Sequence, residues 1–314
     1  MVAADARGAD AHGVFRLPQY ARRISSGGIN RRPDIRLVED HLATALLDGD
    51  NGMGHVVMTR AADLAIEKAQ RAGIGWVGVR RSNHAGPAAL YATMPLERDM
   101  IGLYLAIGNA NHMAPWGGTE ALLSTNPIAI AVPAGKHPPV VLDMATTTAA
   151  YGKVKQKARR GEPIPEGWMI DGSGKALTDP SRVAEGSLLP SGGYKGYGLA
   201  FMFGLLAGTL NGAAFGRSVV DFNTDAVTPT NTGHSIAAID IAGFADVTEF
   251  KVKVDAVCDD ITNSVPLPDA GPIRIPGESS AEARTRNLSA GIPVSHALLA
   301  ELNQLAADCG CRPI

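Results

Sequence analysis

The stretch RAGIGWVGVRRSNHAGP, Arg71 to Pro87, decides how the first half of the chain folds. Its residues Gly73, Gly75 and Gly78 have the G-x-G-x-x-G spacing by which many enzymes bind a dinucleotide. In that motif the glycines follow a strand and open a helix. Here the order is reversed, because a helical pattern capped by Thr59 ends at Gly73 and a short apolar run typical of a buried strand follows. We therefore interpret the spacing as a coincidence and expect no dinucleotide site at these glycines.

The segments around this stretch alternate between strand-like and helix-like patterns. A strand after Gly73, a helix opened by Pro87 and a further strand make a β-α-β crossover. Interleaving of strands and helices predicts an α/β fold. We expect strands at 74–79, 101–107, 126–132 and 140–142, helices at 59–72, at 87–97, after Asp143, after Gly198 and after the cap Ser295, and a long surface loop at 157–180.

Length, composition and charge limit the classes of function. A chain of 314 residues with 45% hydrophobic content can bury a sizeable core. The formal net charge of −2 indicates no basic surface for nucleic acid or for a membrane, so a small molecule is the expected partner. The 3 cysteines cannot all pair and lack the spacing of a zinc site, which favours a reducing cytoplasm and no metal. The N-terminus has no signal-peptide pattern.

The segment GLAFMFGLLAGTLNGAAFG, Gly198 to Gly216, carries no charged residue. From Gly204 onward a glycine recurs at every fourth position. These glycines and an Asn favour a buried helix that packs closely on another backbone, rather than a membrane span. A glycine face of this kind also suits a subunit interface.

The first cluster of reactive side chains is DAHGVFRLPQY, where His12, Arg16 and Tyr20 stand four residues apart and would share one face of a helix. Reduction of a keto acid requires such a pair, because a histidine donates a proton to the carbonyl oxygen and an arginine binds the carboxylate. A solvated helix face capped by Asp10 would have the same pattern. A second histidine, His84, precedes a helix N-terminus and would act as a neutral base or merely pack at the loop.

Further side chains suited to ligand binding follow predicted strands or stand among glycines. Asp143 ends an apolar strand and Thr146 follows it, in the order that phosphate binding requires, although a plain N-cap would look alike. Lys195 is surrounded by glycines, including Gly196, that let a ligand approach the backbone, unless it is a solvated lysine in a flexible loop. Asn109 follows a strand end, where ligand crevices lie.

Taken in order, these clusters resemble the malate/L-lactate dehydrogenase family. That group also contains sulfolactate, ureidoglycolate and diketogulonate oxidoreductases and cyclic imino acid reductases. The resemblance covers nearly the whole chain, and glycine, proline and tryptophan anchor most of its blocks. The blocks are DARGADAHGVFRLPQYARRISSGGIN, SNHAGPA, APWGGTEALLSTNPIAIAVP, LDMATTTAAYGKV, GEPIPEGW, LPSGGYKGYGL and IRIPGE.

The resemblance implies NAD(P)-dependent hydride transfer on an α/β mixed-sheet fold that is not the doubly wound Rossmann fold. It implies an acid/base role for His12 or His84, with Arg16 beside them, and we add Tyr20 on the same predicted face. It also implies a homodimer whose site is close to the subunit interface. The cofactor residues that it implies are Asp143, Met144, Ala145, Lys195, Gly196, Pro276, Gly277 and Glu278. We add Asn109 and Thr146 to this set because of the chemistry and position of their own side chains.

The chain departs from the family pattern at several places. Ala11 stands where many members have a serine before the histidine, and Asn109 replaces a serine that often contacts the nicotinamide. The helical residues that usually precede the first block are absent from this sequence: either Met1 is a misassigned start, or the truncation is real and the first lobe loses packing partners. We divide the chain into a helical substrate and dimerisation lobe, 1–45 with 279–314, and an α/β cofactor-binding region, 46–278.

We therefore predict an NAD(P)-dependent oxidoreductase that interconverts a small 2-hydroxy acid and its 2-oxo acid. The sequence leaves the choice between NAD and NADP open. Reduction of a cyclic imino acid, such as piperideine- or pyrroline-2-carboxylate, is the alternative within the family, and it protonates nitrogen instead of oxygen. Outside the family, Lys195 would be a Schiff-base lysine for pyridoxal phosphate, or the chain would be a catalytically degenerate binding protein.

Overall fold

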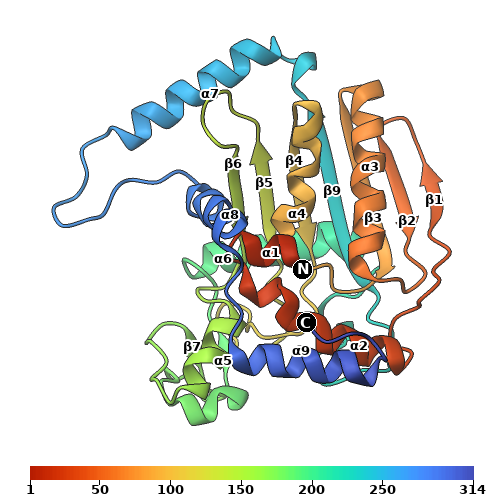
Figure 1. The fold of residues 1–314 in the computed structure, drawn as a ribbon, viewed down its shortest axis with the longest axis vertical. Coiled ribbons are helices and arrows are strands. Elements are labelled where there is room, and N and C mark those ends of the chain that lie inside the picture. The colour runs from red at the N-terminus through yellow and green to blue at the C-terminus, as the bar shows by residue number, and fades with distance from the viewer.

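The computed structural model describes residues 1–314, apart from the side chain of Arg159. The described residues form one mixed seven-stranded sheet in the order β1-β2-β3-β9-β4-β5-β6 (Figure 1). Only β2 and β3 pair in parallel within this described sheet. The mixed α/β sheet confirms the predicted fold class. Its strands are β1 (Arg36–Asp40), β2 (Thr44–Asp48), β3 (Ile74–Ser82), β4 (Met100–Ala106), β5 (Ile128–Val132), β6 (Val140–Met144) and β9 (Thr232–Asp240).

Strand β9 lies between β3 and β4 and is antiparallel to both. The predicted order of strand, helix and strand is confirmed, because α4 (Ala88–Ala92) and the 3₁₀ helix η3 (Met94–Arg98) connect β3 to β4. The two strands are nevertheless not hydrogen-bonded neighbours. The sequence analysis did not predict β9, which is buried from Thr232 to Ala238 and therefore lacks the alternating pattern of a half-exposed strand.

The glycines of the G-x-G-x-x-G spacing serve packing. Gly73 ends α3 (Gly54–Ala72) in a left-handed conformation with φ 80°. A Cβ at Gly75 would lie 2.1 Å from the carbonyl oxygen of Ala65, and one at Gly78 would lie 2.1 Å from Asn211 Oδ1. Glycine thus lets α3 and the turn at 209–211 pack directly on β3. This packing supports the interpretation of the spacing as a coincidence.

Two helices begin earlier than the sequence predicts. α3 begins at Gly54, so the predicted cap at Thr59 is wrong: the Thr59 hydroxyl lies inside the helix and donates to the carbonyl oxygen of His55 at 2.8 Å. α6 (Tyr194–Ala207) begins four residues before Gly198. In both cases the residues ahead of the predicted start continue the helix without a capping side chain.

The helix expected directly after Asp143 is placed wrongly, since the next helix is α5 (Tyr151–Arg159). Between them, the backbone N–H groups of Thr146 and Thr148 donate to the carbonyl oxygens of Thr125 and Leu189. These bonds to distant segments replace the bonds of a first helical turn. The expected loop at 157–180 contains the end of α5 and the short strand β7 (Met169–Ile170), which pairs with β8 (Ser187–Leu188).

Helices from the two ends of the chain lie together beside the sheet (Figure 1). α1 packs against α8, and α2 packs against α9, whose first turn is capped by Ser295 as predicted. Strand β1 falls within the range 1–45 but belongs to the sheet. α7 extends away from the sheet in Figure 1. The bounds of these helices are α1 (Val2–Ala6), α2 (Leu17–Ser25), α7 (Val247–Thr262), α8 (Glu278–Ala290) and α9 (His296–Asp308).

The main hydrophobic core lies between the sheet and the helices α3 and α4. Val57 and Met58 of α3, Val77 of β3, Tyr91 of α4 and Ile236 of β9 are fully inaccessible to solvent. Burial of such a side chain contributes about 1.5–3 kcal/mol, so the core fixes the strands that end at the candidate site. No helix within the described part of the chain combines the length and apolar character that crossing a bilayer requires.

Candidate active site

The ring of His84 is held by two stacked rings and at one nitrogen. Its face stacks on Phe222, with ring centroids 4.8 Å apart and planes at 15°, and it also stacks on His12 at 5.6 Å and 22°. The Tyr20 hydroxyl lies 2.5 Å from His84 Nδ1. We call His12, Arg16, Tyr20, His84 and Phe222 the histidine cluster. Because Nδ1 is engaged by Tyr20, Nε2 is the nitrogen of His84 that can exchange a proton with a ligand.

The structure brings His12, Arg16 and Tyr20 together, but not on one helix. His12 lies in the 3₁₀ helix η1 (Asp10–His12), Arg16 in η2 (Val14–Arg16) and Tyr20 in α2. Gly13 separates the first two turns, because a Cβ there would lie 1.6 Å from Asp5 Oδ1. The prediction of one helical face is therefore wrong in its local structure.

Asp10 does not cap a helix here. The first residue ahead of η1 is Ala9, and no side chain bonds to the turn's N–H groups. The solvated-face reading of the first cluster also fails, since Tyr20 is buried and His12 and Arg16 are half-buried against the histidine cluster.

The Arg16 guanidinium is oriented by neutral groups. Its Nε donates to the Ala11 carbonyl oxygen at 2.9 Å, its Nη1 donates to Gln19 Oε1 at 2.8 Å, and the group lies 5.5 Å from the centre of the Phe222 ring. Among the described side chains, no carboxylate lies within ion-pair distance of it. Burial lowers the pKa of Arg16, although an arginine stays charged near neutral pH. A half-buried cation without an acidic partner is suited to bind a ligand carboxylate.

The histidines of the cluster are neutral at neutral pH. Burial, together with the charge of Arg16, lowers the pKa of His12 to about 4. Burial also lowers the pKa of His84 well below its usual value. Burial raises the pKa of the Tyr20 hydroxyl, so that it stays protonated. The sequence analysis attributed a neutral His84 to a helix N-terminus, but desolvation is the main cause.

A layer of buried polar side chains supports the backbone next to His84. Asn83, only 2% exposed, donates from Nδ2 to the carbonyl oxygen of Asn51 at 3.0 Å and to that of Gly52 at 3.0 Å. His234 Nε2 lies 3.2 Å from the Asn83 carbonyl oxygen, and its Nδ1 lies 2.7 Å from the Tyr104 hydroxyl. The backbone on either side of His84 therefore has few alternative positions.

Asn109 belongs to this buried layer. Its Nδ2 donates to the Thr232 hydroxyl, and its carbonyl oxygen accepts the N–H of Phe222 at 3.0 Å. Asn109 is 7% exposed, and in this structure its side-chain amide bonds to β9 while its main-chain carbonyl supports the loop that carries Phe222.

The predicted residues at the end of β6 lie close to the His84 loop. Asp143 Oδ2 accepts the N–H of Ala89 at 2.9 Å, in the first turn of α4. Met144 pairs with Ile128 in the sheet, and Ala145 follows it. Thr146 is fully buried, and its hydroxyl donates to the Thr125 carbonyl oxygen at 3.0 Å. The structure thus connects the turn after β6 to the helix that follows His84.

The predicted glycines lie where backbone segments approach closely. A Cβ at Gly196 would lie 2.2 Å from the Ser191 carbonyl oxygen and 2.9 Å from that of Thr146. Gly277 has φ 91°, and a Cβ there would lie within 3.0 Å of Val141 in β6. Lys195, beside Gly196, is exposed. We call 143–146, 195–196 and 276–278 the cofactor turns.

The third cofactor turn is bonded to β6 and borders a groove. The Pro276 carbonyl oxygen accepts the N–H of Val141 at 2.9 Å, and Glu278 Oε2 accepts the N–H of Ile275 at 3.2 Å. A groove of about 740 Å³ lies beside Glu278, between α8 and the segment at 137–138. A bound ligand of nucleotide size has room at this place.

Two residues of the site were missed in the sequence analysis. Phe222 stands between acidic and polar residues in a loop, and no local pattern marks it. His55, in the first turn of α3, packs edge-on to Tyr20 with ring centroids 5.4 Å apart. Both ring nitrogens of His55 are buried without a hydrogen-bond partner among the described residues, and burial lowers its pKa to about 4. Even with these histidines, no group of three possible metal ligands is found among the described residues.

Fold and site together define an α/β oxidoreductase built on a mixed sheet. The resemblance seen in the sequence blocks is confirmed by a sequence model of the family, which matches residues 1–303. The chain belongs to the malate/L-lactate dehydrogenase family.

The similarity extends over nearly the full chain. Malate dehydrogenase from Pyrococcus abyssi is 42% identical over 320 residues, which cover 99% of this chain and 87% of that protein. The solved sulfolactate dehydrogenase from Methanocaldococcus jannaschii is 38% identical, with a TM-score of 0.91, over 99% of this chain and 89% of that one. The solved delta1-piperideine-2-carboxylate reductase from Pseudomonas syringae is 28% identical, with a TM-score of 0.85, over 97% and 90%.

Two further relatives are named with their cofactors. Ureidoglycolate dehydrogenase (NAD(+)) from Escherichia coli K12 is 34% identical over 94% of this chain and 83% of that protein. (2R)-3-sulfolactate dehydrogenase (NADP(+)) from Chromohalobacter salexigens is 34% identical over 78% of this chain and 73% of that protein. Both nicotinamide cofactors therefore occur among the relatives.

Proposed function

We propose that the protein is an NAD(P)-dependent oxidoreductase that interconverts a small 2-hydroxy acid, such as malate or sulfolactate, and its 2-oxo acid. One observation carries the proposal: a neutral His84, which stacks on two rings, lies in one cluster with the half-buried cation of Arg16. This pairing offers a proton acceptor and a carboxylate clamp, which a 2-hydroxy acid requires.

His84 exchanges the proton of the substrate oxygen. When Nδ1 carries a proton and donates it to the Tyr20 oxygen, Nε2 presents a lone pair that accepts the proton of the substrate hydroxyl. The imidazolium formed in this way returns the proton when a 2-oxo acid is reduced. Tyr20 holds the ring at Nδ1, and the rings of Phe222 and His12 stack on it. His12 is the other candidate acid/base, but the structure assigns no bond to its ring that would select a tautomer.

Arg16 binds the substrate carboxylate. Ala11 and Gln19 use two edges of its guanidinium and set its plane, and they carry no charge that would compete with a carboxylate. An arginine fork binds a carboxylate through two parallel hydrogen bonds, so it also fixes which face of the substrate carbon is presented.

The cofactor turns fit a nicotinamide dinucleotide, which supplies the hydride acceptor or donor. Glycine at 196 and 277 keeps backbone close to backbone, so that main-chain N–H and C=O groups line the path of a ligand. We assign binding of the nicotinamide cofactor to Asn109, Asp143, Met144, Ala145, Thr146, Lys195, Gly196, Pro276, Gly277 and Glu278. Lys195 is exposed beside Gly196, where its charge can reach a phosphate.

We also propose that the protein is a homodimer that joins through α6. Leu199, Phe201 and Met202 are 42–52% exposed on this helix, and Leu210 follows it at 64%. The first turn of α6 contains Lys195 and Gly196, so a second copy that packs on this helix would complete the region around the cofactor turns. Light scattering should give twice the chain mass, and Met202→Glu should give the chain mass. A wild-type monomer would contradict this proposal.

Two organisational proposals accompany the enzyme assignment. Residues 1–45 with 279–314, apart from strand β1, form the substrate lobe, and the contacts of α1 with α8 and of α2 with α9 support this, whereas α6 carries the proposed dimer contact. The protein acts in the cytoplasm, which its unpaired cysteines support, and fractionation of the host cells would test this.

The decisive experiment is titration of the purified protein with NADH and, separately, NADPH, followed by the fluorescence of the reduced nicotinamide. Addition of oxaloacetate, sulfopyruvate and piperideine-2-carboxylate to the better-bound complex then identifies the substrate class. We expect saturable binding and oxidation by a 2-oxo acid. Oxidation by the cyclic imine alone would move the assignment to imino acid reduction, and binding of neither cofactor would end the proposal.

A further inference from the structure

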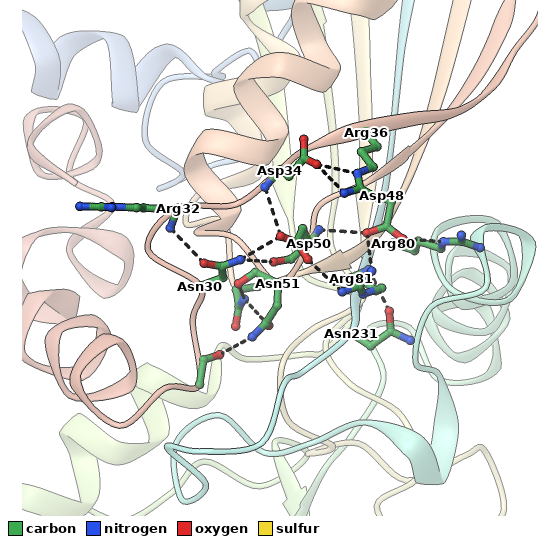
Figure 2. A network of polar contacts seen from close by, with 12 residues as sticks. Asn30, Arg32, Asp34, Arg36, Asp48, Asp50, Asn51, Arg80, Arg81 and Asn231 are labelled. Atoms are coloured by element: carbon green, nitrogen blue, oxygen red, sulfur yellow. Dashed lines mark hydrogen bonds and ion pairs between the residues drawn. The ribbon is translucent and has the colours of Figure 1, made fainter.

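Left-handed backbone conformations concentrate next to the histidine cluster. Of the six described non-glycine residues with φ between 43° and 61°, four lie in one polar network. They are Asp50, Asn51, Arg81 and Asn231 (Figure 2). Each such conformation costs free energy, so it persists only where the surroundings enforce it. Their convergence from three separate segments calls for a cause in the tertiary structure.

The network encloses a bulge at the end of β3. The register of β3 with β9 shifts between Val79 and Ser82, so that Arg80 and Arg81 fall outside the regular pairing. A β-bulge bends a strand and turns the side chains that follow it. Here the residues that follow are Asn83 and His84, two and three positions beyond Arg81. The direction of the bulge therefore sets the direction in which the chain enters the site.

Arg81 is held in the bulge by both its side chain and its backbone. Its Nη1 lies 3.0 Å from Asp48 Oδ1, and its Nη2 lies 3.0 Å from Asp50 Oδ1. Its N–H donates to Asn231 Oδ1 at 2.8 Å, and its carbonyl oxygen accepts the N–H of Asn51 at 2.7 Å. Figure 2 shows the two carboxylates and the Asn231 side chain converging on Arg81. The left-handed conformation of Arg81 is thus fixed from several directions.

The same network reaches His84 through Asn83 and the turn at 51–54. Asn83 Nδ2 donates to both oxygens of Asn51, at 3.0 and 2.9 Å. A Cβ at Gly54 would lie 2.2 Å from the Asn83 carbonyl oxygen and 2.5 Å from that of His84. The turn at 51–54 therefore contacts the backbone of both residues, and a change in the bulge is transmitted to the imidazole.

We propose that Arg81 is a positioning residue: its ion pairs with Asp48 and Asp50 hold the β3 bulge that aims His84 at the substrate oxygen. This inference rests on the proposed acid/base role of His84. The Arg81 side chain is 52% exposed, and ion pairs at the surface add little to stability, while Asp48, only 10% exposed, keeps a second ion pair with Arg80. The ion pairs act on the geometry of the site rather than on the stability of the fold.

Arg81→Gly tests the proposal, because glycine accepts the left-handed backbone and removes only the ion pairs. We expect kcat to fall about tenfold, with KM for substrate and cofactor within about twofold of wild type. Misalignment of the proton acceptor should also raise the solvent deuterium isotope effect on kcat. Arg81→Lys, which can keep one ion pair, should recover part of the loss. If Arg81→Gly fails to fold, Asn231→Gly, which removes the acceptor of the Arg81 N–H, should show the same fall in kcat.

Asp99→Gly is the matched control. Asp99 also has a left-handed φ of 55°, and its side chain, 48% exposed, pairs with Lys251 away from the histidine cluster. For Asp99→Gly we expect the kcat and the isotope effect of the wild type, and a melting temperature no higher than that of Arg81→Gly. Equal losses in both variants, or an unchanged kcat in Arg81→Gly, would overturn the positioning role.

His84→Gln separates this inference from the proposed function. A variant without activity, combined with an unchanged Arg81→Gly, would refute the positioning role alone. A fully active His84→Gln would refute the acid/base assignment itself, whatever Arg81→Gly shows.

Discussion

The histidine cluster and the cofactor turns are held in place by different kinds of contact. The cluster consists of side chains from segments far apart in the chain, and contacts between rings and side-chain hydrogen bonds hold them. The cofactor turns consist of backbone that glycine lets approach other backbone. A side-chain site can be altered atom by atom without moving the chain, whereas a backbone site changes only when the chain moves. Substitutions should therefore affect chemistry in the first region and binding together with stability in the second.

Loss of the His84 imidazole should have the largest effect. His84→Gln keeps size and polarity but removes the proton acceptor, so we expect kcat to fall about 10²- to 10⁴-fold with the cofactor affinity unchanged. Steady-state kinetics and NADH fluorescence titration measure the two quantities. His137→Gln is the control, because His137 borders the groove beside Glu278 and lies outside the histidine cluster. It should leave kcat unchanged. A loss of cofactor binding in His84→Gln would mean that the two regions are not separable.

Removal of the Arg16 charge should come next. Arg16→Gln eliminates a charged hydrogen-bond donor to the substrate carboxylate, which contributes about 1.5–3 kcal/mol, so KM for the 2-oxo acid should rise roughly 10- to 100-fold. The neighbouring Arg22 is exposed and bonds only to the Asn223 carbonyl oxygen. Arg22→Gln should leave KM unchanged. If both variants raise KM equally, the loop at 221–228 and not the Arg16 charge supports substrate binding.

Acid should destabilise the protein through His234, which lies in the buried polar layer beside the histidine cluster. Burial lowers the pKa of His234 from 6.5 to about 4, so its contribution to stability is present above pH 6.5 and is lost as pH falls toward 4. By linkage, this one residue should cost about 2 kcal/mol between pH 7 and pH 5. Urea unfolding at both pH values should show a smaller acid effect in His234→Gln than in wild type. An equal acid effect would assign the pH dependence to other groups.

Gly196→Ala should have the smallest effect on catalysis, and it tests whether the cofactor turns depend on close backbone packing. The added Cβ would lie 2.2 Å from the Ser191 carbonyl oxygen, so the turn must shift, at a cost of about 1–3 kcal/mol. Cofactor affinity and melting temperature should fall together while kcat at saturation changes little. A Cβ at Gly198 meets no atom within 4 Å, so Gly198→Ala is the control. A fall in kcat alone would contradict the distinction between the two regions.

The two regions also differ in how far sequence predicts them. Asp143, Lys195 and the turn at Gly277 stand in local patterns of strand end and glycine, which sequence spacing can express. Phe222 meets His84 only because β9 and its preceding loop return to the sheet after α6, and that contact has no local signal. His12, Arg16 and Tyr20 were selected as one helical face, and they converge instead because Gly13 interrupts the helix. The strands β3 to β6 were predicted from apolar runs, whereas β9, with its buried Thr232, His234 and Ser235, was not.

The position of β9 has a consequence for synthesis on the ribosome. Strands β1, β2 and β3 form one half of the sheet, β4, β5 and β6 form the other, and β9 alone hydrogen-bonds the two halves within the described sheet. Until the segment up to Asp240 has left the ribosome, β3 and β4 each present an unpaired edge, and such edges promote association with other chains. During synthesis, β3 and β4, which end near the candidate site, are therefore among the last strands whose edges become covered.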